Sequence, residues 1–187
     1  MLAVLGHEGL MTVLIRSILL LGCLISLAAG AENIEYKIKA AYLYNFTKFI
    51  SWPESNSASF NICIIGNDPF GDLLGALENK TALEKPINVV RYDNYKQIKD
   101  CQIAYLGKDD IRIDSPVQGT LIVGSLASLS NIHQQSFFTA QQGMIGFALE
   151  DEKIKLHINL KSLKQSGLGI SAKLIEVATL IEGGGRE

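Results

Sequence analysis

The sequence predicts an α/β fold: a mostly parallel sheet flanked by helices on both faces, with an antiparallel edge hairpin near the C-terminus. Short, nearly continuous apolar runs such as 60–65 are typical of strands covered on both faces. Helical patterns separate these runs at a spacing that implies right-handed crossovers between parallel strands. Near the end of the chain, residues 153–158 alternate charged and apolar side chains, which indicates a strand with one face in water.

The N-terminus predicts export. Residues 1–31 contain a short start with one positive charge, an apolar run at 17–28 and small residues at 29–31, which are the three zones of a secretory signal peptide. The apolar run is shorter than the roughly 20 residues that span a membrane. Residues 1–10 are expected to be a translation-start artefact. An uncleaved anchor and a lipoprotein modified at Cys23 are the alternatives.

The mature chain, 32–187, has the length of a single domain, since 187 − 31 leaves 156 residues. Its charges nearly balance, because the whole sequence has 17 basic and 19 acidic residues. The sequence therefore has no excess of positive charge of the kind that nucleic-acid binding requires. We therefore expect a single domain without a nucleic-acid partner.

An aromatic helix at 37–53 is expected to organise the domain. It contains the only tryptophan and is expected to end before Pro53, because a proline disfavours the helical conformation of the preceding residue. The main interpretation is a core helix lying along the sheet. The alternative is that its aromatic end, Phe49, Trp52 and Pro53, also meets a partner. The predicted buried stripe is Ile34, Ile38, Ala41, Tyr42, Phe46, Phe49 and Ile50.

The elements that follow alternate between strand and helix. Strands are predicted at 60–65, 87–92, 103–106 and 120–124. Asp68 is expected to cap a helix that starts at Pro69. Further helical segments are predicted at 94–100, 125–131 and 134–141.

The last part of the chain changes pattern. Strands at 144–149 and 153–158 are predicted to pair as a hairpin at the sheet edge, with charged residues that discourage further pairing. Helices are expected at 159–166 and 170–181. The end of the chain, 183–187, is expected to be a frayed tail.

Catalytic patterns are weak. His157 is expected on the wet side of its strand, and neither it nor His133 has the spacing of a metal ligand. Ser125 follows a strand but lacks the second glycine of a nucleophile elbow and an apparent base. We therefore expect a non-enzymatic protein with no cofactor and no metal, and a hydrolase using Ser125 is the remote alternative.

The loop after the first strand is the alternative ligand site. It lies at a strand's carboxyl end, where open α/β sheets bind ligands. Its residues for a small molecule would be Gly66, Asn67, Asp68 and Phe70. The simpler interpretation is a turn followed by a helix cap.

Cys63 and Cys101 remain after removal of the leader. An even count in an exported protein favours a disulfide. In a sheet with strand order 2-1-3 their strands are neighbours, so the two sulfurs could meet. A structural bridge, a labile bridge that reports oxidation and two buried thiols all remain open.

The longest of several distinctive blocks is Lys39-Ala-Ala-Tyr-Leu-Tyr-Asn-Phe-Thr-Lys-Phe-Ile-Ser-Trp-Pro53. It resembles the opening signature of the YfiR family of bacterial periplasmic proteins. The others lie at 62–71, 101–106, 120–124, 143–147, 158–159 and 167–171. Together these blocks span nearly all of the mature chain in the family's order.

The resemblance implies a periplasmic regulator that represses an inner-membrane diguanylate cyclase through the cyclase's periplasmic domain. It also implies a homodimer, an outer-membrane lipoprotein that sequesters the repressor, and an effect on cyclic-di-GMP signalling and biofilm formation. Cys63 and Cys101 match the family's widely spaced cysteine pair. The closer pair of some members is missing, because 136–143 contains no cysteine.

Overall fold

The computed structural model describes residues 34–107, 111–115, 117–126 and 131–181. The chain divides into two units, Met1–Lys37 and Ile38–Glu187. The predicted leader and the tail at 183–187 lie outside the described residues. In the first unit, the described residues 34–37 are helical, and the rest of this section concerns the second unit.

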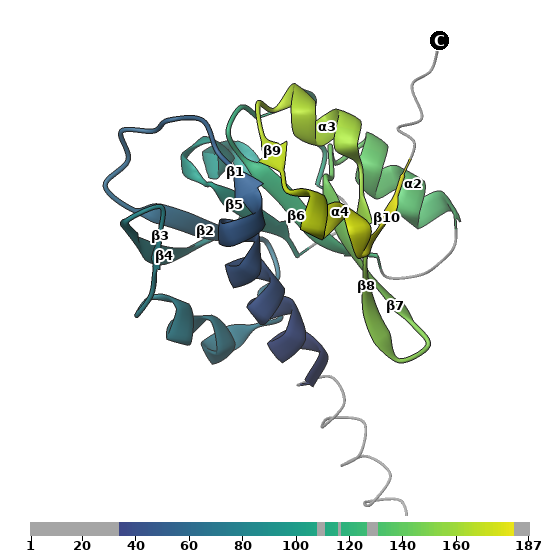
Figure 1. Cartoon of the computed structure of the whole chain (residues 1–187), viewed down its shortest axis with the longest axis horizontal. Helices are drawn as coiled ribbons and strands as arrows, with labels where there is room; N and C mark the ends of the chain where they lie inside the picture. The colour runs from purple at the N-terminus through teal and green to yellow at the C-terminus, as the bar shows by residue number, and fades with distance from the viewer. Residues whose placement is uncertain (1–33, 108–110, 116, 127–130, 182–187) are drawn as a thin grey trace, which may run out of the picture. The chain divides into compact units, whose positions relative to one another are not determined.

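An eight-stranded sheet forms the centre of the second unit, in the order β10-β8-β7-β6-β5-β2-β4-β3 (Figure 1). Strands β4, β2, β5, β6 and β7 run parallel, and β7 and β8 form the predicted antiparallel hairpin. β2 lies between β4 and β5, which confirms the 2-1-3 order. The strands are β2 (Phe60–Ile65), β3 (Thr81–Ala82), β4 (Lys85–Tyr92), β5 (Ile103–Leu106), β6 (Leu121–Leu126), β7 (Ile145–Glu150), β8 (Lys153–Ile158) and β10 (Ala178–Leu180).

Helices cover both faces of this sheet, as predicted. Consecutive strand residues point to opposite faces. On β6, Ser125 accepts a hydrogen bond from Lys39 of the first helix, whereas a Cβ on Gly124 would meet Phe137 of α2 (Asn131–Thr139). The first helix and α2 therefore pack on opposite faces.

The first helix is confirmed, but its buried face differs in part from the predicted one. Among the described residues it is helical at 34–49. Ile34, Ile38 and Ala41 are exposed, so the predicted stripe is wrong at its N-terminal end. Phe46 and Ile50 are buried as predicted, and Tyr42 and Phe49 are half-buried. The other buried residues, Lys39, Ala40, Leu43 and Thr47, were not in the predicted stripe. The predicted helical period is right, but the N-terminal part of the stripe was placed on the wrong side of the helix. A hydrophobicity pattern places an apolar residue on the inward side, and here Lys39 lies there.

The helix also ends earlier than predicted. Ile50 and Ser51 form β1, which pairs antiparallel with β9 (Gly169–Ile170) in a separate two-stranded sheet. Pro53 therefore follows a short strand. Tertiary pairing with a segment about 120 residues later, which local sequence cannot show, decides this boundary.

The predicted helix at 170–181 is wrong. β9, the short helix α4 (Ala172–Glu176) and β10 occupy this stretch. β10 pairs parallel with β8, so the hairpin lies one strand in from the sheet's end. The apolar residues of 174–181 satisfy a helical period, but β-sheet partners at both ends of the segment override this local preference.

The remaining differences are smaller. The segments after β2 and β4 are the 3-10 helices η1 (Gly71–Leu77) and η2 (Tyr95–Asp100). β6 continues to Leu126, where a helix was expected, and the rest of that predicted helix to residue 130 lies outside the described residues. The predicted helix at 159–166 is confirmed as α3 (Leu160–Gln165).

Candidate functional site

A cleft of about 540 Å³ opens at the amino ends of β2 and β5. Phe60 is the first residue of β2, and Gln102 directly precedes β5. We call it the Trp52 cleft. It is lined by Trp52, Pro53, Glu54, Ser55, Asn56, Ser59, Phe60, Leu83, Lys85, Cys101, Gln102, Gln118 and Gly119. It therefore combines aromatic and aliphatic side chains with amides, hydroxyls and one group of each charge.

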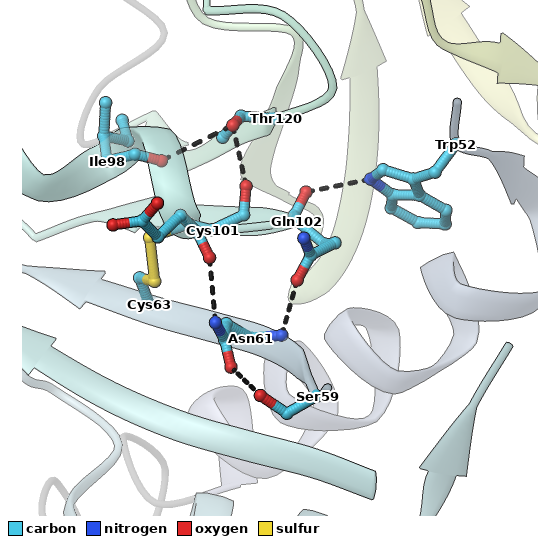
Figure 2. Close-up of a disulfide and its surroundings, with 9 residues drawn as sticks. Trp52, Ser59, Asn61, Cys63, Ile98, Cys101, Gln102 and Thr120 are labelled. Atoms are coloured by element: carbon cyan, nitrogen blue, oxygen red, sulfur yellow. Dashed lines mark hydrogen bonds between the residues drawn. A yellow bond between two sulfur atoms is a disulfide. The ribbon is translucent and has the colours of Figure 1, made fainter. Parts of the chain in front are cut away.

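Trp52 is fixed in the cleft by two contacts. Its Nε1 donates a hydrogen bond to the carbonyl oxygen of Gln102 at 3.0 Å (Figure 2). Its ring also meets the Phe60 ring edge-on, with the two ring centroids 5.1 Å apart. Gln102 is itself held, because its Oε1 accepts a hydrogen bond from the backbone N–H of Asn61 at 2.6 Å. A half-buried indole anchored at its edge is a rigid platform for a ligand or a partner.

The disulfide adjoins the cleft through Cys101, which is one of the lining residues. Cys63 in β2 is joined to Cys101, which lies between η2 and β5, with their Cα atoms 5.8 Å apart, and both residues are buried. Thr120 Oγ1 donates to the carbonyl oxygen of Cys101 at 2.7 Å, which ties the bridge to the start of β6 (Figure 2). The predicted pairing is present, and it links the cleft wall to the centre of the sheet.

The rim of the cleft carries an exposed leucine in an unfavourable backbone conformation. Leu83 is 52% exposed, with φ of 50°, and Glu84 follows with φ of 63°. Two consecutive left-handed residues form the type of hairpin turn that favours Asn or Gly. An L-residue with a bulky side chain costs about 1–2 kcal/mol there.

The predicted partner-binding residues separate into two groups. Trp52 and Pro53 line the cleft, and Phe49 does not. Phe49 is half-buried, and its carbonyl oxygen accepts a hydrogen bond from the N–H of Ser171 where β1 meets β9. Gln102, Gln118 and Leu83 belong to the site but were missed, because turns and crossovers bring them to Trp52 from distant parts of the sequence.

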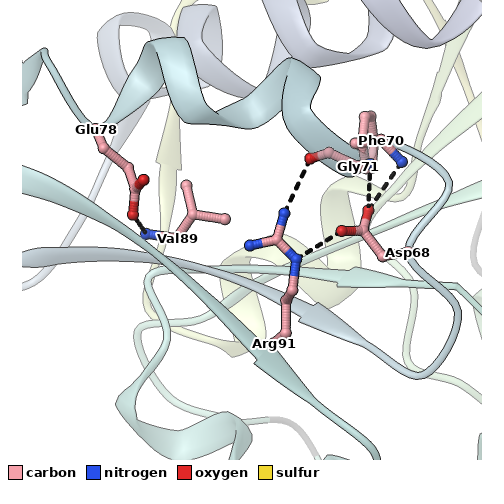
Figure 3. A network of polar contacts seen from close by, with 6 residues as sticks. All are labelled: Asp68, Phe70, Gly71, Glu78, Val89 and Arg91. Carbon is pink, nitrogen blue, oxygen red and sulfur yellow. Dashed lines mark hydrogen bonds and ion pairs between the residues drawn. The ribbon is translucent and has the colours of Figure 1, made fainter.

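The loop proposed as the alternative ligand site is closed by its own contacts. Asp68 Oδ1 accepts hydrogen bonds from the N–H groups of Phe70 and Gly71, at 2.8 and 3.2 Å. Asp68 Oδ2 pairs with Arg91 Nε at 2.7 Å, and Arg91 also donates to the carbonyl oxygen of Gly71 (Figure 3). The predicted cap is wrong in its position: η1 begins at Gly71 rather than Pro69, its N-cap residue is Phe70, and Asp68 instead accepts hydrogen bonds in the turn that leads into η1.

Ser125 has a basic neighbour that the sequence did not indicate. Lys39 Nζ donates to Ser125 Oγ at 2.7 Å, and Tyr105 Oη lies 2.8 Å from the same oxygen. Lys39 is only 2% exposed, since it lies on the inward side of the first helix. The three side chains join the first helix to β5 and β6.

The prediction that His157 lies on a wet surface is wrong. His157 is 6% exposed, and its Nε2 lies 2.8 Å from Glu150 Oε1 across the hairpin. β10 pairs with β8 at this position, so the outer strand helps to cover the histidine. The side chain of His133 lies outside the described residues.

The described ranges lack two features. None of their helices has the length and apolar character needed to cross a membrane. In the same ranges, no group of three or more His, Cys, Asp or Glu side chains is arranged to hold a metal ion.

The fold and the cleft define a class of protein: an α/β domain with a mostly parallel sheet and an amide-lined aromatic cleft beside a disulfide. The chain belongs to the YfiR/HmsC-like family, whose model matches residues 36–179. This match covers the cleft and all of the sheet except Leu180, the last residue of β10. No curated protein matches the chain.

Proposed function

We propose that this protein is a non-enzymatic regulator exported to the periplasm, where it binds the periplasmic domain of an inner-membrane diguanylate cyclase and represses it. The result would be a lower output of cyclic-di-GMP and altered biofilm formation. Membership of the YfiR/HmsC-like family is the observation that carries this proposal. The predicted leader supports export, and a buried disulfide suits an oxidising compartment.

The Trp52 cleft is the surface we assign to the cyclase. Tryptophan is enriched among the residues that dominate binding energy at protein interfaces. Trp52 is held rigidly, and Pro53 and Leu83 are exposed beside it. Backbone strain at an exposed residue is a reason to suspect a function. A role in contacting a partner accounts for Leu83, because a leucine there adds apolar contact area at the expense of turn stability.

A homodimer and an outer-membrane lipoprotein that sequesters the repressor complete the proposal. Both follow from the family resemblance. Phe49 remains a candidate for one of these contacts, since it lies outside the lining of the cleft.

The experiment uses Leu83→Asn in a deletion strain. Asn adopts the left-handed conformation more readily than Leu, so the variant should unfold at the same or a higher temperature than the parent. It should nevertheless raise cyclic-di-GMP above the level of the strain complemented with the parent protein. It should also recover less cyclase from solubilised inner membranes.

Trp52→Ala should give the same loss of repression. Tyr92→Ala, a half-buried aromatic at the carboxyl end of β4, is the matched control and should repress normally. Unchanged cyclic-di-GMP on deletion of the gene itself would contradict the proposed function. Normal repression by both cleft variants would contradict only the choice of surface.

Sensing of a small molecule is the second candidate function. Its predicted location is the loop at 66–71, where the Asp68 carboxylate already forms an ion pair with the Arg91 guanidinium. The Trp52 cleft favours this function more than the loop does, because its volume lies within the range of small-molecule sites, about 300–1,000 Å³.

A further inference from the structure

We infer that the Trp52 cleft binds an uncharged saccharide of one or a few rings. This inference names a ligand class for the site and does not depend on the identity of the protein partner. It follows from the fixed indole, the orientation of two carboxamides and the balance of charge in the cleft.

The indole offers the apolar part of the site. A sugar ring has one face rich in C–H groups, and such a face packs against an aromatic side chain and excludes water from both. Trp52 suits this contact because the hydrogen bond to Gln102 and the edge-on contact with Phe60 already fix its orientation. A preorganised ring loses little conformational entropy when a ligand binds.

Two carboxamides offer the polar part. Gln102 uses its Oε1 for Asn61, and its Nε2 donates to no described residue. Gln118 has the opposite arrangement: its Nε2 donates to the carbonyl oxygen of Gln165 at 2.9 Å, and its Oε1 accepts from no described residue. The cleft therefore presents one amide donor and one amide acceptor, each on a side chain held by its other end. A hydroxyl group can satisfy either one, because it both donates and accepts.

The charges in the cleft disfavour an ionic ligand. Among the described residues that line the cleft, Glu54 and Lys85 are the charged ones, and their charges are opposite. Lys85 already donates to the carbonyl oxygen of Ser55 at 2.6 Å. A neutral ligand loses less hydration on entering such a site than an anion or a cation would. The ligand is therefore neutral, rich in hydroxyl groups and apolar on one face, which describes a saccharide.

Occupancy of the cleft would also regulate the protein. If the cyclase binds at Trp52, as in the proposed function on which this step rests, a saccharide on the same indole would compete with it. Sugar binding would then relieve repression. The binding experiment below uses purified protein alone, so its outcome is independent of whether a cyclase is the partner.

Trp52 is the only tryptophan in the chain, so its fluorescence reports directly on the cleft. We would titrate the purified, disulfide-bonded protein with a panel of neutral oligosaccharides: gluco-oligosaccharides with α and β linkages and N-acetylchito-oligosaccharides, each of two to four rings. At least one series should change the Trp52 emission in a saturable way, with matching heat by calorimetry.

Gln118→Ala should weaken that binding by about tenfold or more, because it removes the amide acceptor. Gln135→Ala removes an exposed carboxamide from α2 and should bind like the parent. Equal thermal melting of the two variants shows that the fold is intact. The inference is overturned if no member of the panel binds, if Gln118→Ala binds as tightly as the parent, or if only charged molecules such as amino acids or nucleotides change the Trp52 emission.

Discussion

Lys39 and Ser125 are 86 residues apart in the sequence, and the ammonium group of Lys39 donates a hydrogen bond to the hydroxyl of Ser125 at 2.7 Å. The lysine lies on the buried side of the first helix, and Nζ is also 6.0 Å from the centre of the Phe147 ring. A charge in this position stabilises the fold only while its partners remain, because an uncompensated buried charge is costly.

Replacement of Lys39 tests this contact. Lys39→Ala should lower the free energy of unfolding by about 2–4 kcal/mol, since it leaves a cavity and removes the donor to Ser125. Ser125→Ala should cost about 1.5–3 kcal/mol, because the hydrogen bond that it removes involves a buried charged group. The double variant should cost less than the sum of the two, as expected for residues in contact. Urea unfolding measures all three.

Lys48→Ala is the control for this series. Lys48 is exposed on the same helix and lies over the ring of Tyr44 at 4.5 Å. Its loss should cost less than about 1 kcal/mol. Equal costs for Lys39→Ala and Lys48→Ala would show that the buried contact does not stabilise the fold.

The disulfide should contribute strongly to stability. Its cysteines are 38 residues apart, and the chain-entropy model gives about 4 kcal/mol for closing such a loop. Replacing both Cys63 and Cys101 with serine should therefore lower the denaturant midpoint of unfolding. Addition of reductant should destabilise the parent protein and leave the double variant unchanged. A parent that melts identically with and without reductant would argue against a stabilising bridge.

Gly124 tests the packing of α2 on the sheet, and Gly75 is its control. A Cβ on Gly124 would lie 2.6 Å from Cε2 of Phe137, whereas a Cβ on Gly75 would meet nothing within 4 Å. Gly124→Ala should destabilise the protein by about 1–3 kcal/mol through overpacking. Gly75→Ala should be neutral or should stabilise it by up to about 1 kcal/mol, because it restricts the unfolded chain. Thermal unfolding would separate the two, and similar melting points would refute this packing.

Asp68 should stabilise the loop after β2 through its hydrogen bonds to backbone N–H groups. Asp68→Ala should cost about 1 kcal/mol, because it leaves the N–H groups of Phe70 and Gly71 without their acceptor. Arg91→Ala should cost less, since Arg91 is half exposed and surface ion pairs contribute about 0–1 kcal/mol. Asp72→Ala, an exposed aspartate in the first turn of η1, is the control and should change stability by less than about 0.5 kcal/mol. An Asp68→Ala protein as stable as this control would show that these hydrogen bonds are not needed.

The sequence by itself determined the central layer of the fold. Continuous apolar runs predicted β2 and β5 with their correct ends, because strands buried on both faces have few polar residues to obscure them. Alternation predicted β8 and therefore the hairpin. The strand order then placed Cys63 beside Cys101, and the aromatic run placed Trp52 and Pro53 among the candidates for binding.

Only the tertiary structure decided the parts that depend on distant partners. β1 and β9 form because Ile50 and Ile170 pair across the chain, and neither segment has a strand pattern of its own. Lys39 faces inward, where Ser125 accepts a hydrogen bond from its ammonium group, although a lysine in a helix pattern usually marks the solvent-facing side. The cleft likewise depends on Leu83, Gln102 and Gln118 meeting Trp52. Local sequence encodes period and propensity, whereas a site assembled from separate turns exists only after the chain has folded.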